Sequence, residues 1–336
     1  MFSYGLFGGV YGFDPAVLLL SAMALDAALG GFTSAFRFLP HPEAQLRRVV
    51  SALEGKLNRE KRSAVDRAIR GALVAIFGVA AAGAIGLGVA WLGRNHDFGW
   101  VVELLLIAAL IDQRACQARL RGVGKALSAG SLEEARQTLQ PLTHRDTARM
   151  DDHGVVRSAL EIGAVNVCAG AIAPIFWYVL FGLPGMAVCR ALTVMNAAIG
   201  HSSARYRAFG MTAARLNDVA QLVPVRIAGL LIALAALFAP TAKPGAAFAT
   251  MMREARNYPA PGVGWPVAAV AGALGLALGG PRHYAERTTD DPWIGSGSAQ
   301  AEKTHLRRGL YLFAVARLIN VMLVALLALL RYGVAV

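Results

Sequence analysis

The chain has 336 residues, of which 56% are hydrophobic and only 16% are charged, and its formal net charge is +12. Soluble domains have about 25% charged residues, so this composition excludes an ordinary soluble protein and indicates several membrane-spanning segments. Lysine and arginine lie between the apolar runs and not on one continuous face, which favours the positive-inside rule over nucleic-acid binding. We therefore expect one domain over residues 1–336, an all-α, polytopic helical bundle in a lipid bilayer, with no nucleic-acid partner.

Seven apolar runs are candidate membrane segments. A helix needs about 20 mostly apolar residues to cross the hydrocarbon core of a bilayer. Three runs reach this length, with no charged residue except Arg317 in the last: 71–93, 162–189 and 310–330. Four further runs are shorter or rich in glycine and proline, and we expect some to be tilted or re-entrant: 16–32, 98–111, 227–242 and 266–280.

Polar segments separate these runs, at about 43–70, 113–157, 201–226 and 282–308. Their basic residues place them on the cytoplasmic side by the positive-inside rule. The short, nearly neutral connection at 94–97 then lies on the opposite side, which puts the N-terminus outside. Within the second polar segment, Ser131 followed by two glutamates predicts the N-cap of an amphipathic helix. We therefore expect basic cytoplasmic loops and a cytoplasmic helical hairpin.

Polar residues inside apolar runs are the first candidates for chemistry, since the sequence contains no HExxH, GxSxG, CxxC or P-loop motif and leaves metal ligands unknown. An ionisable side chain at membrane depth costs about 3 kcal/mol or more unless it faces a cavity or a partner. The candidates in or beside the runs are Asp26, Glu103, Glu161, Asn166, Arg190, Asn196 and Arg317. For Glu103 and Arg317, near the ends of runs, a structural role is favoured because long side chains can reach the surface.

Glu161 and Asn166 lie at the start of a long apolar run, and for them a functional and a structural role stay equally open. Their spacing of five does not hold both on one face of a regular helix. Gly163, Gly170 and Pro174 predict that this helix is broken.

Two clusters combine arginine with aromatic and polar residues, at 200–226 and at 253–284. Guanidinium groups bind phosphate and carboxylate in two-point contacts, so these loops suit an anionic ligand. The alternative is contact with lipid headgroups or a signal of topology only. Charge by itself leaves both interpretations open.

Several short motifs occur in a characteristic order along nearly the whole chain. They are Leu39-Pro-His-Pro42, Gly130-Ser-Leu-Glu-Glu-Ala-Arg136, Arg145-Asp-Thr147, Ala173-Pro-Ile-Phe176, Ala214-Arg-Leu-Asn-Asp218, Gly264-Trp-Pro266 and Pro292-Trp-Ile-Gly295. Each motif is weak by itself, but their order and spacing make chance agreement improbable. Together they resemble the adenosylcobinamide-phosphate synthases of cobalamin biosynthesis, the family called CbiB or CobD.

The resemblance implies a multi-pass protein of the bacterial inner membrane, compatible with a homo-oligomer. It implies an ATP-dependent amide ligase that joins an aminopropanol phosphate to a propionate carboxylate of the corrinoid adenosylcobyric acid, giving adenosylcobinamide phosphate. ATP and Mg²⁺ are expected with it.

The same resemblance implies roles for individual residues. Asp146, Glu161 and Asp218 would bind metal or act as general base, and Asn166 would orient substrate. The arginines expected to bind oxyanions are Arg145, Arg205, Arg215 and Arg226. His41 and Tyr206 would be further substrate contacts.

This chain departs from the family pattern mainly at carboxylates. Val165 and Ala169 stand where the family has acids, and Asn196 stands where it has an aspartate. Two hypotheses therefore stay open beside an unrelated transporter. One is the ligase with a variant site, and the other is a non-catalytic or differently acting paralogue, such as an ancillary or sensor protein similar to AmpE.

Overall fold

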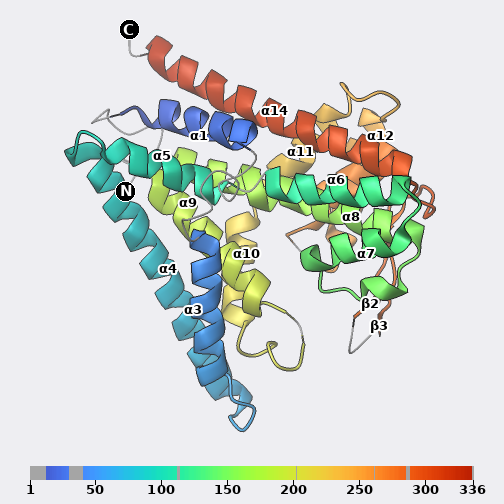
Figure 1. The fold of residues 1–336 in the computed structure, drawn as a ribbon, viewed down its shortest axis with the longest axis horizontal. Helices are drawn as coiled ribbons and strands as arrows, with labels where there is room; N and C mark the ends of the chain where they lie inside the picture. The colour runs from blue at the N-terminus through green and yellow to red at the C-terminus, as the bar shows by residue number, and fades with distance from the viewer. Residues whose placement is uncertain are drawn as a thin grey trace. The chain divides into compact units, whose positions relative to one another are not determined.

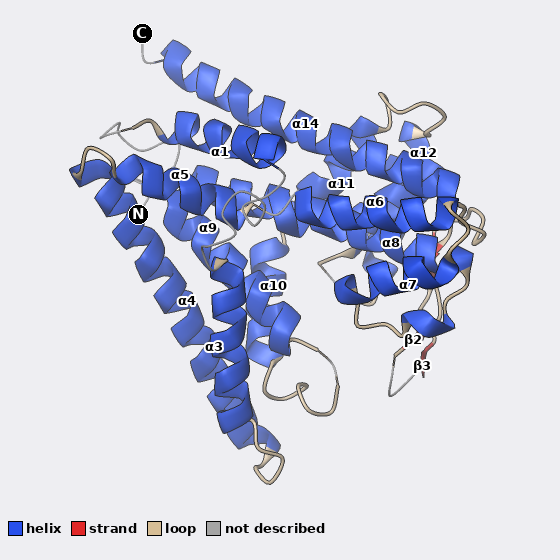
Figure 2. Cartoon of the chain, viewed as in Figure 1, coloured by secondary structure: helices blue, strands red, loops and turns tan. Residues whose placement is uncertain are grey.

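The computed structural model describes residues 13–29, 41–111, 114–201, 203–260, 262–284 and 288–334. Most of these residues are helical (Figures 1 and 2). Contacts group the chain into two compact units. Unit 1 comprises Met1–Ile111, Ala173–Leu222 and Val324–Val336, and unit 2 comprises Asp112–Ile172 and Val223–Leu323. The single domain over 1–336 stays a prediction, and the motif residues 30–40 and Pro261 lie outside the described residues.

Unit 1 consists of helices only among its described residues. They are α1 (Pro15–Leu29), α3 (Pro42–Leu57), α4 (Ala64–Asn95), α5 (Gly99–Leu110), α9 (Ala173–Ile199), α10 (Met211–Gln221) and the last part of α14 (Lys303–Val334). α3, α9 and α10 pack against α4 (Figure 1). Glycines allow the close approach of α4 and α9, since a Cβ at Gly86 would lie 2.7 Å from the Cα of Pro184. In α9, Gly182 has a φ of 69°, two residues before Pro184, and the helix is kinked there.

Unit 2 contains helices and four two-residue strands. The helices are α6 (Arg114–Ser128), α7 (Leu132–Leu139), η2 (Gln140–Leu142), η3 (Thr147–Arg149), α8 (Asp152–Asn166), η4 (Val167–Ile172), α11 (Pro224–Ala235), α12 (Pro244–Glu254), η5 (Ala255–Asn257), α13 (Gly264–Leu274) and most of α14. The strands are β1 (Leu278–Gly279), β2 (Arg282–His283), β3 (Thr288–Thr289) and β4 (Trp293–Ile294). They form antiparallel pairs, with Leu278 opposite Ile294 and Arg282 opposite Thr289. No pattern in the sequence indicated these strands.

The three long apolar runs predicted from the sequence are confirmed as helices. Among the described residues, three helices are long and apolar enough to cross a membrane, at Ala64–Asn95, Asp152–Ile199 and Lys303–Arg331. A fourth is added if α10 and α11 form one bent span. Only 22% of the apolar window in α4 is buried, so most of that helix presents an apolar surface suited to lipid. The chain is thus an all-α membrane protein.

The four weaker runs form short helices, as their composition suggested. α1, α5, α11 and α13 have 15, 12, 12 and 11 residues, fewer than the roughly 20 that a straight crossing requires. Tilted or re-entrant segments are consistent with these lengths. Which polar segments face the cytoplasm stays a prediction.

Two local predictions are confirmed. The hydroxyl of Ser131 accepts a hydrogen bond from the backbone N–H of Glu134 at 3.3 Å, so Ser131 is the N-cap of α7. α6 packs against α7, and the cytoplasmic helical hairpin stays a prediction. The predicted break after Glu161 is also present, because η4 is a π-helical segment between α8 and α9.

Candidate functional site

A buried carboxylate in unit 2 joins three distant parts of the chain. Glu161, on α8, is only 2% exposed. Its Oε2 accepts hydrogen bonds from Arg145 Nη2 at 2.5 Å, from Tyr258 Oη at 2.8 Å and from Arg282 Nη2 at 3.2 Å. Its Oε1 accepts the backbone N–H of Gly279 at 2.9 Å. Four donors therefore satisfy both oxygens of this carboxylate. We call these five residues the Glu161 cluster.

Local structure brings each donor to Glu161. Residues 145 and 146 pair with 283 and 284, through a β-bridge between Arg145 and Tyr284 and a 2.9 Å bond from Asp146 N to His283 O. Arg282 lies on β2, next to this pairing. Gly279 has a φ of 79°, a conformation that favours glycine, and its N–H points to the carboxylate. The paired strands thus hold Arg145 and Arg282 on the same acid.

The charges in the Glu161 cluster determine the protonation of its members. Burial alone would lower the pKa of Arg145, but the Glu161 carboxylate raises that pKa above its ordinary value. Burial, together with Glu161, raises the pKa of Tyr258 well above the ordinary range for tyrosine. Arg282 also binds Asp291 Oδ2 at 3.1 Å and lies 4.7 Å from the centre of the Tyr258 ring. At neutral pH Arg145 is therefore a cation and Tyr258 is a hydrogen-bond donor.

A polar cavity of about 200 Å³ opens beside this cluster. Four arginines, one histidine and three carboxylates contribute to its lining, which consists of Arg145, Asp146, Arg149, Met150, Asp151, Gly154, Arg157, Glu161, Gly279, Pro281, Arg282 and His283. Asp146 Oδ2 binds Arg149 Nε at 3.1 Å. Asp151 is the N-cap of α8 and accepts the N–H of Gly154 at 2.7 Å. Paired charges of both signs thus surround a space open to a small ligand.

Three residues proposed from the sequence, Arg145, Asp146 and Glu161, share this cavity. Asn166 does not line it and accepts a hydrogen bond from Arg317 Nη2 at 3.1 Å, while Gln117 binds Arg317 Nη1 at 2.7 Å. The physical reason is that the π-helical segment begins only after Asn166. Within the regular helix α8, a spacing of five residues separates Glu161 and Asn166 by about 140°.

The remaining proposed residues lie elsewhere in their units, each with its own partner. In unit 1, His41 Nδ1 accepts the N–H of Glu43 at 3.3 Å and caps α3, and Arg215 lies 3.7 Å from Asp218 on an exposed face of α10. Arg205 binds Glu54 at 2.9 Å and lies over the ring of Tyr206. In unit 2, Arg226 lies over the ring of Trp265, 5.0 Å from its centre. None of these residues lines the polar cavity.

Sequence reasoning assigned no role to several residues of the site. Arg282 and His283 lie in the basic cluster at 253–284, so the sequence indicated the segment that contains them but gave neither residue a role. Further cluster or cavity residues to which it gave no role include Arg149, Asp151, Arg157, Tyr258 and Gly279. Only their position relative to Glu161 identifies them.

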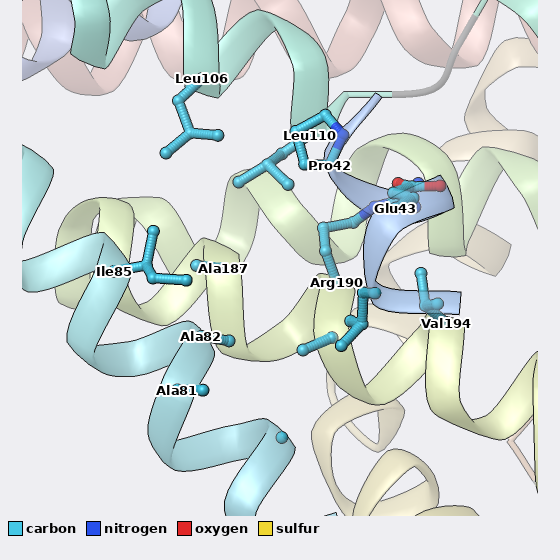
Figure 3. Close-up of a pocket in the computed structure, with 13 residues that line it drawn as sticks. Pro42, Glu43, Ala81, Ala82, Ile85, Leu106, Leu110, Ala187, Arg190 and Val194 are labelled. Carbon is cyan, nitrogen blue, oxygen red and sulfur yellow. The ribbon is translucent and has the colours of Figure 1, made fainter. Parts of the chain in front are cut away.

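A second pocket, in unit 1, is apolar and has a volume of about 140 Å³. It is lined by residues of α3, α4, α5 and α9, and Figure 3 shows Glu43 and Arg190 close together among apolar side chains. Arg190 forms an ion pair with Glu43. Since the pair lies in apolar surroundings, removing either partner would leave an uncompensated buried charge and would destabilise the protein.

The described residues contain no group of three or more His, Cys, Asp or Glu side chains that could hold a metal ion by themselves. Mg²⁺ is commonly held by one or two carboxylates together with substrate phosphates. Asp146 and Asp151 are the carboxylates beside the cavity arginines that could serve in this way. The donor set therefore fits a metal that arrives with a phosphate ligand.

Comparison with known proteins identifies the family. The family profile described as CobD/Cbib protein matches residues 19–313. Cobalamin biosynthesis protein CobD of Rhodobacter capsulatus is 35% identical over 316 residues, which cover 94% of this chain and 98% of the relative. The proteins of the same name from Brucella suis and Citrobacter koseri are 34% and 33% identical, with coverage of 88% and 85% of this chain and 92% and 87% of the relatives. No solved structure matches the chain. The chain therefore belongs to the CobD/CbiB family and has a role in cobalamin biosynthesis.

Proposed function

We propose that this protein is an ATP-dependent amide ligase that attaches an aminopropanol phosphate to adenosylcobyric acid. The observation that carries the proposal is the Glu161 cluster beside a cavity lined by arginines, in a chain of the CobD/CbiB family. The alternative of a non-catalytic paralogue remains relevant because Val165 and Ala169 replace acids of the family pattern. The experiment below separates the two.

The reaction requires both activation and charge compensation. The propionate carboxylate would take the terminal phosphoryl group of ATP, giving an acyl phosphate and ADP. The free amine would then attack the carbonyl carbon, forming the amide bond and releasing inorganic phosphate, while a base takes the proton of the amine. Bound Mg²⁺ would add positive charge at the phosphates.

Within this proposal, the protein residues have different tasks. Glu161 positions Arg145 and Arg282, because its two oxygens already accept four hydrogen bonds and leave no site for a proton from substrate. The two guanidiniums would bind phosphate or carboxylate oxygens with their remaining N–H groups. Asp146 is a more accessible carboxylate at the same cavity and is our candidate for the base or metal ligand.

Product formation tests the function directly. A bacterial strain lacking the synthase would be complemented with this chain, and membranes would be assayed for adenosylcobinamide phosphate from adenosylcobyric acid, ATP, Mg²⁺ and the amine. We expect product from the natural chain, none from Glu161→Gln, and normal amounts from Arg121→Gln, an exposed residue that does not line the cavity. Absence of product despite normal membrane insertion would refute the ligase.

Restoration of the family acids separates a decayed site from a different function. Val165→Glu, Ala169→Asp and Asn196→Asp would be combined in an otherwise unchanged chain. If the natural chain is inactive and the triple variant forms product, the lost acids account for the lost reaction. If both are inactive, the paralogue hypothesis replaces the ligase.

We also propose that the protein resides in the bacterial inner membrane, with the polar cavity on the cytoplasmic side. The support is the basic character of the segments that form the cavity, since Arg145, Arg149 and Arg157 all lie in the segment 113–157. ATP is supplied on this side.

A further inference from the structure

The size of the polar cavity limits what it can hold. Its volume is about 200 Å³, whereas pockets for drug-sized ligands have about 300–1,000 Å³. A corrinoid or a whole nucleotide exceeds this space. A phosphate group with a few attached carbon atoms is of suitable size.

One side of the cavity offers an excess of hydrogen-bond donors. Each guanidinium has five N–H donors, but Glu161 engages only one nitrogen of Arg145 and one of Arg282, whose Nη1 binds Asp291. Arg282 is 6% exposed, and its Nε has no hydrogen-bond partner among the described residues. Arg157 binds the backbone carbonyl of Ala299 and lies 5.4 Å from the centre of the Trp293 ring. This wall is suited to a phosphate, whose oxygens only accept.

The other side offers a carboxylate oxygen. Asp151 uses Oδ1 to cap α8 through the N–H of Gly154. In the part of the chain that the structure describes, its Oδ2 has no ion-pair or hydrogen-bond partner, whereas Asp146 binds Arg149 with its second oxygen. Asp151 is therefore the acid of this cavity that can best receive a cationic group.

We propose that the cavity binds a small zwitterionic phosphate ester, with its phosphate on Arg145, Arg157 and Arg282 and its ammonium at Asp151. The inference rests on the proposed function for the identity of the ligand, an amino-alcohol phosphate. It deepens that function by locating the amine substrate on Arg145, which the family resemblance indicated, together with Asp151, Arg157 and Arg282, which it did not. The cavity charges recognise both ends of the molecule, and the volume of about 200 Å³ suits a phosphate ester with few carbon atoms.

Three matched ligands test the two-ended recognition on the natural full-length chain in detergent, by isothermal titration calorimetry. They are 1-amino-2-propanol phosphate, isopropyl phosphate, which lacks the ammonium group, and 1-amino-2-propanol, which lacks the phosphate. We expect the zwitterion to bind most tightly, isopropyl phosphate to bind more weakly, and the amino alcohol to show no measurable binding. Equal affinity of the two phosphates would overturn the role of the acid.

Variants then locate the site. Asp151→Asn preserves the cap of α8, because asparagine caps helices as well as aspartate does, and should weaken the zwitterion about two- to fivefold without affecting isopropyl phosphate. Arg157→Gln should weaken both phosphates about tenfold or more. Arg157→Lys, which keeps the positive charge but not the planar fork, is the second variant if Arg157→Gln unfolds the protein, and it should weaken both phosphates less than Arg157→Gln does. Arg121→Gln is the control and should bind as the natural chain does.

The outcomes separate this inference from the ligase proposal. If the zwitterion binds the natural chain and no cavity variant changes its affinity, the site lies elsewhere and the ligase proposal is unaffected. If ATP displaces the zwitterion and the affinity for ATP itself falls in Arg157→Gln, the cavity belongs to the nucleotide and the inference is wrong. If the zwitterion binds in the cavity but membranes form no amide product, the inference is supported and the ligase proposal fails.

Discussion

Replacing Glu161 by glutamine should destabilise unit 2 strongly although the side chain keeps its size. The variant removes the negative charge that compensates the guanidiniums of Arg145 and Arg282, while the side chain of Arg145 is only 14% exposed and that of Arg282 is 6% exposed. Loss of one partner from a buried ion pair costs about 3–5 kcal/mol. Arg282 retains Asp291 at 3.1 Å, so we expect the lower value, about 3 kcal/mol.

Thermal unfolding in detergent measures this effect, and a decrease of roughly 6–12 °C in the midpoint is expected for a unit of this size. Glu133→Gln is the matched control, since its side chain is 68% exposed and its ion pair with Arg136 should contribute less than about 1 kcal/mol. A double variant with Arg145→Met should lose less stability than the sum of the single variants, because the orphaned cation is removed. Equal midpoints for Glu161→Gln and Glu133→Gln would refute the central role of this carboxylate.

Three further predictions concern other parts of the chain. Burial would raise the pKa of Glu254, but the N–H of Gly295 and a neighbouring arginine lower that pKa below its ordinary value. The stabilising effect of the Glu254 carboxylate should therefore be full above pH 4.5 and lost as the pH falls through the depressed folded-state pKa. In chemical denaturation, the free energies of unfolding of Glu254→Gln and the natural chain should become equal in acid, and a difference independent of pH would contradict this. Gly86→Leu should abolish the close packing of α4 on α9, because a Cβ at this position already meets the α9 backbone. The folded fraction extracted from membranes should fall by several-fold, as measured by size-exclusion chromatography. An unchanged elution profile would exclude that contact. Ala260→Cys should react with impermeant thiol reagents from the cytoplasmic side, because Tyr258 and Arg145 share the Glu161 carboxylate and we propose that the cavity faces the cytoplasm. Asn95→Cys should react from the opposite side, and the native cysteines are buried and should not interfere. The reverse labelling would refute the proposed side of the cavity.

Local features of the structure could be predicted because they depend on residues near each other in the chain. The long apolar runs became helices, Ser131 caps α7, and the glycine and proline residues after Glu161 accompany a π-helical break. The same reasoning could not locate the break to the residue. Because the π-helical segment starts at Val167, Asn166 remains on regular helix and contacts Arg317.

The sequence by itself determined that this is a helical membrane protein, and its ordered motifs indicated the CobD/CbiB family. Both conclusions rest on composition and order along the chain. Only the tertiary structure decided which charges form a site, because Tyr258, Gly279 and Arg282 lie 97, 118 and 121 residues from Glu161. A buried carboxylate selects partners by distance in space, so Arg145 and Arg282 meet on Glu161, while Arg205 and Arg226, equally basic in the sequence, contact Glu54 and Trp265.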